Sequence, residues 1–324
     1  MANSTETALL NPSTPMAFLP PDLAYQMTVT AYVAIGGLAV LVWDIITHLY
    51  ADWKLLTRYK VALPTIVYFL SRLSTLAYML VGTIFQTAPT GNCEVVGETT
   101  CTIYHVTVSS TALLFFLRVR AIFNKNRYIT AIFFLLWIGV LGGSLTVVTS
   151  LSGVPIGNTK YCTFSNFKPY RSTANIIVAT FDTSVFIAVT WRLSFRKAYT
   201  KGGGRTFDFF GQYLPSFTRA LLQDGQKYYM VATVSNLLVL IMDFAPGIPI
   251  AYRTILLMPT IALGNIMACS VFRHTKMCQM NEGVEGAHAV ILGKNLNVTA
   301  GIPSKTESSV VSDAKDETQS SSIV

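Results

Sequence analysis

Charged residues are scarce in this sequence of 324 residues, and their scarcity defines the class of protein. They make up 12% of the chain, whereas an average soluble domain has roughly a quarter. Hydrophobic residues reach 52%. A helix needs about 20 consecutive apolar residues to cross a bilayer, and a soluble core cannot bury many such segments. The composition therefore excludes an ordinary soluble domain and predicts an all-α integral membrane protein.

Apolar segments of this length recur along the chain and predict a bundle of seven transmembrane helices. The helices are expected at about residues 26–50, 61–85, 103–123, 129–150, 173–193, 228–245 and 254–272. Together they form one domain, residues 26–273, which follows an N-terminal segment, residues 1–25. The tail, residues 274–324, is rich in Ser, Thr and charged residues, and this composition predicts disorder.

The basic residues are unevenly divided between the two sides of this predicted bundle. Of 24 Lys and Arg residues, nineteen fall in the loops and tail of one side and four on the other, while Arg72 lies inside a predicted helix. Basic loops mark the cytosolic side, so we expect the N-terminus outside and the C-terminus in the cytosol. The net charge of +8 is then a matter of topology and contact with the lipid bilayer, not of nucleic-acid binding. The plasma membrane is the default location.

Motifs for catalysis and cofactor binding are missing. The sequence has no Gly-x-Ser-x-Gly, no His-Glu-x-x-His and no phosphate-binding loop. Its four histidines are scattered, which argues against a metal site. No lysine lies within a predicted helix, which excludes a retinal Schiff base. We therefore predict a protein without enzymatic activity or cofactor.

Ionisable residues at membrane depth are costly and are by default candidates for function. Arg72 lies near the middle of its helix, and depth alone makes Asp182 its best partner and Asp44 the second. Such a cluster is either a polar cavity that binds or switches, or a structural ion pair that fixes helix order with the help of interhelical amides, Asn175 among them. The predicted intramembrane polar cluster comprises Arg72, Asp182, Asp44, Asp243, Asn236 and Asn265.

Three cysteines fall on the predicted outer side, where disulfides form. Cys162 lies in the longest outer loop and is expected to bond to Cys93, or alternatively to Cys101. A local bond between Cys93 and Cys101 is a third possibility. Asn3 begins a glycosylation sequon on the outer side. Cys278 follows the last helix in a basic context and is a candidate for palmitoylation.

Two cytosolic segments are candidate binding sites for partners. The loop 194–226 contains three consecutive glycines, followed by apolar residues at helical spacing. This spacing predicts a short amphipathic helix on the membrane surface, or an extension of the sixth helix. The tail 274–324 is the second segment, with serines that are candidates for phosphorylation.

Several stretches resemble a family of multi-pass membrane proteins of mushroom-forming fungi, which share an N-terminal domain of unknown function 6533. The resemblance covers the seven helices and lies in the segments Val42-Trp43-Asp44, Leu63-Pro64-Thr65-Ile66-Val67-Tyr68-Phe69-Leu70-Ser71-Arg72, Leu113-Leu114-Phe115-Phe116-Leu117-Arg118-Val119-Arg120-Ala121, Ile156-Gly157-Asn158-Thr159-Lys160-Tyr161-Cys162 and Asn265-Ile266-Met267-Ala268-Cys269-Ser270-Val271-Phe272-Arg273. It implies that Trp43, Asp44, Ser71, Arg72 and Cys162 are signature positions.

The overall plan is also similar to that of a G-protein-coupled receptor. Seven helices, an outer N-terminus, an outer disulfide and basic cytosolic loops are shared. The third helix ends in Leu117-Arg118-Val119-Arg120 without an acidic residue before the arginine, and the last helix lacks an Asn-Pro-x-x-Tyr motif. We expect a receptor-like or sensor-like protein with an unknown ligand. The alternatives are a membrane scaffold that recruits partners through its tail, or a small-molecule transporter.

Overall fold

The computed structural model describes residues 18–57, 62–123, 126–165, 171–201 and 216–276. They belong to one compact unit, Met1–Met277, and the second unit, Cys278–Val324, lies outside them. The predicted glycosylation site Asn3, the palmitoylation candidate Cys278 and the tail beyond residue 276 are therefore outside the described residues.

The described chain is mostly helical, as the composition predicted. Five helices are long and apolar enough to cross a membrane, and the apolar part of a sixth, Tyr229–Phe244, is shorter. A last helix covers residues 257–276. In chain order the labelled elements are α1 (Pro21–Thr57), α2 (Leu63–Thr87), α3 (Cys93–Ile122), α4 (Arg127–Ser150), β1 (Ser152–Pro155), β2 (Cys162–Ser165), α5 (Arg171–Lys201), α6 (Ser216–Phe244) and α7 (Ile250–Arg253).

Most helices are longer than the apolar segments that predicted them. α1 has 37 residues, or about 55 Å at 1.5 Å per residue, whereas the hydrocarbon core measures about 30 Å. Hydropathy detects only the part that matches the bilayer, so the polar ends of the helices escape it. The predicted loop 194–226 is accordingly helical up to Lys201 and from Ser216 onward, and residues 274–276, predicted as part of the tail, belong to the last helix.

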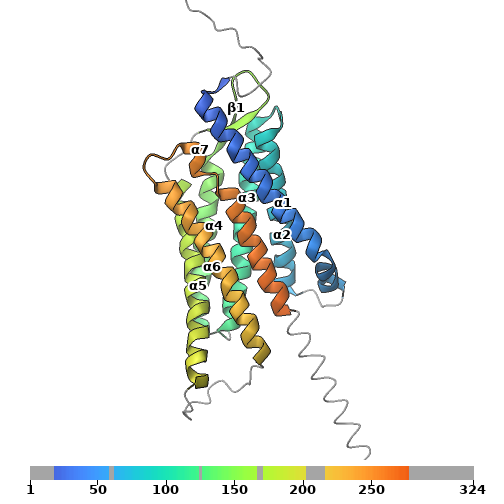
Figure 1. The fold of residues 1–324 in the computed structure, drawn as a ribbon, viewed down its shortest axis with the longest axis vertical. Coiled ribbons are helices and arrows are strands. Elements are labelled where there is room, and N and C mark those ends of the chain that lie inside the picture. Colours follow the sequence, from blue (N-terminus) through green and yellow to red (C-terminus); the bar gives the residue numbers. More distant parts are fainter. Residues whose placement is uncertain (1–17, 58–61, 124–125, 166–170, 202–215, 277–324) are drawn as a thin grey trace, which may run out of the picture. The chain divides into compact units, whose positions relative to one another are not determined.

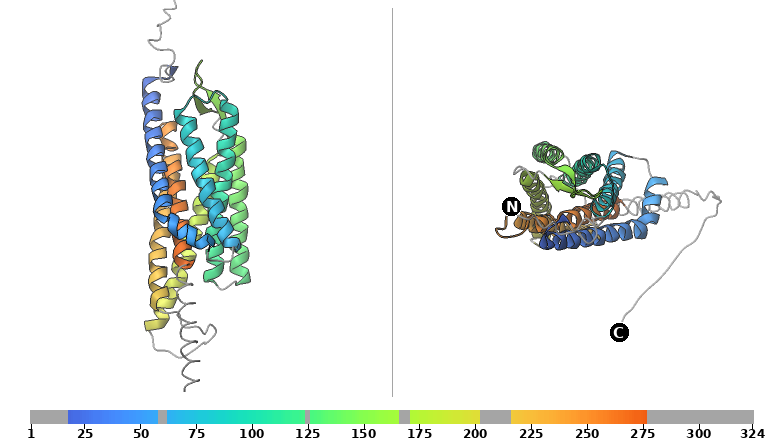
Figure 2. Two further views of the ribbon diagram at one scale, coloured as in Figure 1. Left: turned by 90° about the vertical axis from the view of Figure 1, so that its right-hand side faces the viewer. Right: turned by 90° about the horizontal axis from the view of Figure 1, so that it is seen from above.

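Successive helices pack side by side and close into a ring. α2 lies against α1 and α3, α4 lies between α3 and α5, and α6 packs on α5. α7 contacts both α6 and α1, which brings the end of the ring back to its beginning (Figure 1). The view from above in Figure 2 shows the strands lying across one end of the bundle, inside the ring of helices. We refer to this end as the hairpin end and to the opposite one as the far end.

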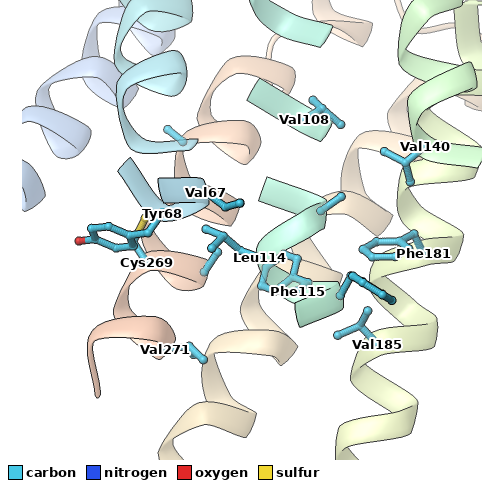
Figure 3. Packing of buried hydrophobic residues seen from close by; sticks show 14 of the residues in the cluster. Val67, Tyr68, Val108, Leu114, Phe115, Val140, Phe181, Val185, Cys269 and Val271 are labelled. Carbon is cyan, nitrogen blue, oxygen red and sulfur yellow. The ribbon is translucent and has the colours of Figure 1, made fainter. Parts of the chain in front are cut away.

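The interior of the ring is filled by a continuous apolar core. Buried side chains come from every long helix, and the largest fully buried ones include Tyr68, Met79, Val119, Val140 and Phe181. Figure 3 shows how side chains from α2, α3, α4, α5 and the last helix meet there. Exposed large hydrophobic residues are also numerous, on α1 and α6 among others. A soluble protein rarely leaves so much apolar surface uncovered, whereas lipid covers it in a membrane.

The two strands correct one detail of the sequence prediction, which placed only a loop between α4 and α5. β1 and β2 pair antiparallel, with Gly153 opposite Phe164 and Pro155 opposite Cys162. The connecting turn reverses at Gly157, whose φ of 57° suits glycine. Strands of only four residues give too short an alternation for the sequence to reveal.

Candidate functional site

A buried ionic cluster joins α1, α2 and the last helix toward the far end of the bundle. The carboxylate of Asp44 lies 3.2 Å from Arg72 and 3.4 Å from Arg273, and the carboxylate of Asp52 lies 3.2 Å from Arg72. The order of contacts is therefore Arg273, Asp44, Arg72, Asp52. All four side chains are buried. Two positive and two negative groups balance, which is the condition for keeping charges at such depth.

Tyr68 occupies the centre of this cluster. Its hydroxyl donates to Asp52 Oδ1 at 2.5 Å and accepts from Arg72 Nη1 at 3.3 Å and from Arg273 Nη1 at 3.1 Å. A phenol has one proton to donate and accepts through its oxygen, so each of its capacities is used. The ring stacks on Phe272, with centroids 5.0 Å apart. Tyr68 thereby links both arginines to one carboxylate.

Of the two partners expected for Arg72, the second, Asp44, is confirmed. The pairing with Asp182 is wrong, because Arg72 contacts Asp44 and Asp52, both on α1. Asp182 is on α5, which packs against α3, α4 and α6, whereas α2 packs against α1 and α3. Equal depth brings two residues together only when their helices are neighbours and the facing sides agree.

Sequence reasoning missed three members of the cluster: Asp52, Tyr68 and Arg273. The predicted first helix ends before Asp52, and Arg273 counts among the cytosolic bases. A usable signal was present in the spacing, because side chains four and eight residues apart share one face of a helix. Asp44 and Asp52 are eight apart, Tyr68 and Arg72 four, and Asn265 and Arg273 eight.

Asn265 holds a second polar contact, closer to the middle of the bundle. Its amide nitrogen donates to Ser71 Oγ at 2.5 Å and to Thr111 Oγ1 at 3.3 Å, and the two hydroxyls are 2.9 Å apart. This contact ties the last helix to α2 and α3. Arg118 ties α3 to the last helix again, because it donates to the carbonyl of Val271 at 2.9 Å.

α5 and α6 are joined by two amide–carboxylate pairs. Asn175 of α5 donates to Asp243 Oδ2 at 3.0 Å, and Asn236 of α6 donates to Asp182 Oδ2. The two pairs are seven residues apart on each helix, with donor and acceptor exchanged. Asp182, Asp243 and Asn236 of the predicted polar cluster thus serve the α5–α6 contact, while Arg72 and Asp44 lie in the ionic cluster. The predicted single cluster divides into three.

The contribution of the α5–α6 pairs to stability can be measured, and we expect it to be moderate. Replacing Asn236 by leucine removes the donor to Asp182, and we expect a loss of about 0.5–2 kcal/mol in the free energy of unfolding, as for other hydrogen bonds between membrane helices. The measurement is a double-mutant cycle with Asp182→Leu in mixed micelles. The double variant should lose less than the sum of the single losses. Strict additivity would show that the contact contributes nothing.

The hairpin end is locked by a disulfide between Cys93 and Cys162. Cys93 is the first residue of α3 and Cys162 the first of β2. The bond is one of the two pairings expected for Cys162. Cys101 lies within α3 as a free, buried thiol, as does Cys269 in the last helix. The backbone of Gly91 also donates to the carbonyl of Lys160, so the turn before α3 is fixed to the hairpin.

Two glycines allow the hairpin to lie directly on α3. A Cβ on Gly97 would come within 2.9 Å of the backbone nitrogen of Gly153, and a Cβ on Gly153 would collide with the carbonyl of Cys93. The ring of Phe164 then packs on Phe85 of α2, with centroids 4.4 Å apart. Backbone lies against backbone here, so neither position accepts a side chain without displacement.

A cavity of about 220 Å³ opens beneath the hairpin. Its wall is formed by α1, α2, α3, the end of α4, β2 and the turn before it, and residues 254–258, with Asn175 from α5. Tyr78, Gly82 and Gln86 of α2 and Cys101 and Tyr104 of α3 belong to it. Among the described residues no three His, Cys, Asp or Glu side chains lie close enough together to hold a metal ion. The described residues that line the cavity carry no charged side chain.

No protein-family model and no curated protein sequence matches the chain.

Proposed function

We propose that the chain is a receptor-like or sensor-like membrane protein with seven spans, which binds its ligand in the cavity beneath the hairpin. The observation that carries the proposal is the position of this cavity at one end of a bundle whose helices are tied by buried polar contacts at the other. A molecule bound between α1, α2, α3 and the segment before the last helix touches elements that also take part in the ionic cluster. Its binding energy can therefore bias their arrangement.

Two features support one orientation of the bundle in the membrane. The basic loops favour a cytosolic far end. The disulfide is at the hairpin end, and disulfides form on the non-cytosolic side of a membrane. Six helices that include the apolar part of α6, together with residues 257–276, add up to the seven spans proposed. The cavity then faces outward, and the plasma membrane is the location that suits an external ligand.

The test is a thermal-shift screen of the protein in nanodiscs against sterols, lipids, peptides and metabolites of both charges. We expect at least one class to raise the melting temperature of the wild type. The same compound should leave Gly82→Leu unaffected, because a leucine at this wall position displaces the flexible end of Met258 and occupies the cavity. Gly36→Leu is the matched control, because a Cβ on Gly36 meets nothing within 4 Å. If no class stabilises the wild type, the receptor proposal is wrong.

A second measurement separates a receptor from a passive binding protein or a transporter. Spin labels on Tyr128→Cys of α4 and Met230→Cys of α6, both exposed positions, report the distance between these helices in a Cys278→Ser background. A receptor should change this distance when the stabilising compound binds. An unchanged distance together with flux of the compound across liposomes would favour the transporter.

A further inference from the structure

The wall of the cavity beneath the hairpin is made entirely of uncharged residues. None of the described residues that line it is Asp, Glu, Lys, Arg or His. Asp243 accepts a hydrogen bond from the wall residue Asn175 but is not itself among the described lining residues. An ion that left water for this cavity would lose its hydration without gaining a counter-ion in the wall, and that loss is large.

Tyr78 brings a hydroxyl group to this wall. Its side chain is buried between α2 and α3. Its ring lies against Tyr104, with centroids 5.7 Å apart. Buried hydroxyls in native structures are nearly always hydrogen-bonded, and a hydroxyl on a cavity wall can form that bond with a carbonyl or hydroxyl of a bound molecule.

A second polar group of the wall, the amide of Gln86, has only a weak hydrogen-bond acceptor. The amide of Gln86 donates to the thioether sulfur of Met258 at 3.2 Å, and sulfur is a poor acceptor. A carbonyl or hydroxyl in the cavity would be a better partner for this amide than Met258. The wall thus offers hydrogen bonds from Tyr78 and Gln86, beside other uncharged polar residues such as Tyr161, within a mainly apolar surface.

The volume limits the size of the molecule. At 220 Å³ the cavity is smaller than the roughly 300–1,000 Å³ that take drug-sized ligands. With about 30 Å³ for each water-sized group, it accommodates on the order of ten non-hydrogen atoms. Sterols, folded peptides and nucleotides exceed that number.

We propose that the cavity binds a neutral, mainly apolar molecule on the order of ten non-hydrogen atoms, held through one carbonyl or hydroxyl by Tyr78. This inference rests on the proposed function, since it names the class of ligand for the same site. Tyr78 is the group that recognises the ligand, and the absence of charge in the wall makes the cavity selective for neutral molecules.

Matched probes test the inference by equilibrium dialysis against nanodiscs, with empty nanodiscs of the same lipid subtracted. The probes are nonan-2-one, hexane-1-sulfonate and hexyltrimethylammonium, each with about ten non-hydrogen atoms, so that charge is the main variable. We expect one nonan-2-one per wild-type chain and at least about tenfold weaker binding of either ion. Gly82→Leu should abolish binding of the ketone, and Gly36→Leu should retain it.

Tyr78→Phe tests the recognition itself without emptying the site. It should weaken nonan-2-one about fivefold, the effect of one lost hydrogen bond, and leave nonane unchanged. Equal binding of the ketone by both proteins would overturn the role of Tyr78. Size-exclusion profiles and melting curves establish that each variant is folded.

The outcomes separate this inference from the proposed function. Binding of the sulfonate or the ammonium probe as tightly as the ketone, and its loss in Gly82→Leu, would overturn the neutral class and leave a ligand-binding receptor in place. In the cationic case Asp243 would be the group that reaches the cavity. Absence of any binding that Gly82→Leu removes would overturn the inference, and the broad screen then decides the proposed function separately.

Discussion

Replacement of Arg72 by methionine should destabilise the bundle severely. The substitution leaves the carboxylate of Asp52 buried without its arginine and reduces the partners of Asp44 to Arg273 and His48. Removal of one partner from a buried ion pair costs about 3–5 kcal/mol. The free energy of unfolding in mixed micelles is the measurement, with Arg120→Met as the control. Arg120 is exposed near the end of α3, so that change should stay within about 0.5 kcal/mol.

A compensating variant shows whether charge balance is the cause. Arg72→Met combined with Asp52→Asn removes one charge of each sign and keeps an acceptor for the Tyr68 hydroxyl. The remaining pair, Asp44 and Arg273, is balanced. We therefore expect the double variant to recover more than half of the loss. If the two losses simply add, packing of the Arg72 side chain, and not its charge, explains the effect.

Replacement of Gly153 by alanine is the second change with a large expected effect. The added Cβ collides with the carbonyl of Cys93, which belongs to the backbone at the disulfide and cannot move away as a side chain would. The hairpin must lift off α3, at about 1–3 kcal/mol for such overpacking. Because β2 and the turn of the hairpin form part of the cavity wall, binding of nonan-2-one should fall together with stability.

Gly142→Ala is the matched control for this prediction. Gly142 lies in the interior of α4, and a Cβ there meets nothing within 4 Å. Alanine is the better helix former, so this change should stabilise the protein by about 0.5–1 kcal/mol. The same substitution, glycine to alanine, is therefore expected to lower the free energy of unfolding at position 153 and to raise it at position 142. A Gly153→Ala variant as stable as the wild type would show that the hairpin is free to shift.

The sequence reveals the helices much better than their contacts. Apolar runs determine where a chain can cross a bilayer, so the helical fold and the approximate segments were predictable. Hydropathy carries no information on the polar ends, which is why Asp52 falls in a predicted loop although it lies in the last turns of α1. Arg273 is misplaced for the same reason, since a basic residue at the end of a predicted span is typical of a cytosolic anchor.

The sequence did not predict which helices are neighbours. Asp182 and Arg72 lie at similar depth, but nothing in one sequence states which side of α5 faces which helix. The cavity was beyond sequence reasoning altogether. It depends on Gly82, on the hairpin and on residues 254–258 coming together, and each of these is by itself an ordinary feature of a loop or helix. Cys162 was the exception, because compartment and loop position restricted its partners to two.

The two amide–carboxylate pairs between α5 and α6 restrict how this pair of helices can move. Both helices place their members seven residues apart, so the pairs share a single register. A slide of α6 along α5 by one turn, about 5.4 Å, breaks both pairs at once, and no intermediate position restores either. The two helices are therefore expected to move together as one rigid unit. A rearrangement between the ends of the bundle is therefore expected at the contacts of this helix pair with α3, α4 and α7, and not at the contact between α5 and α6.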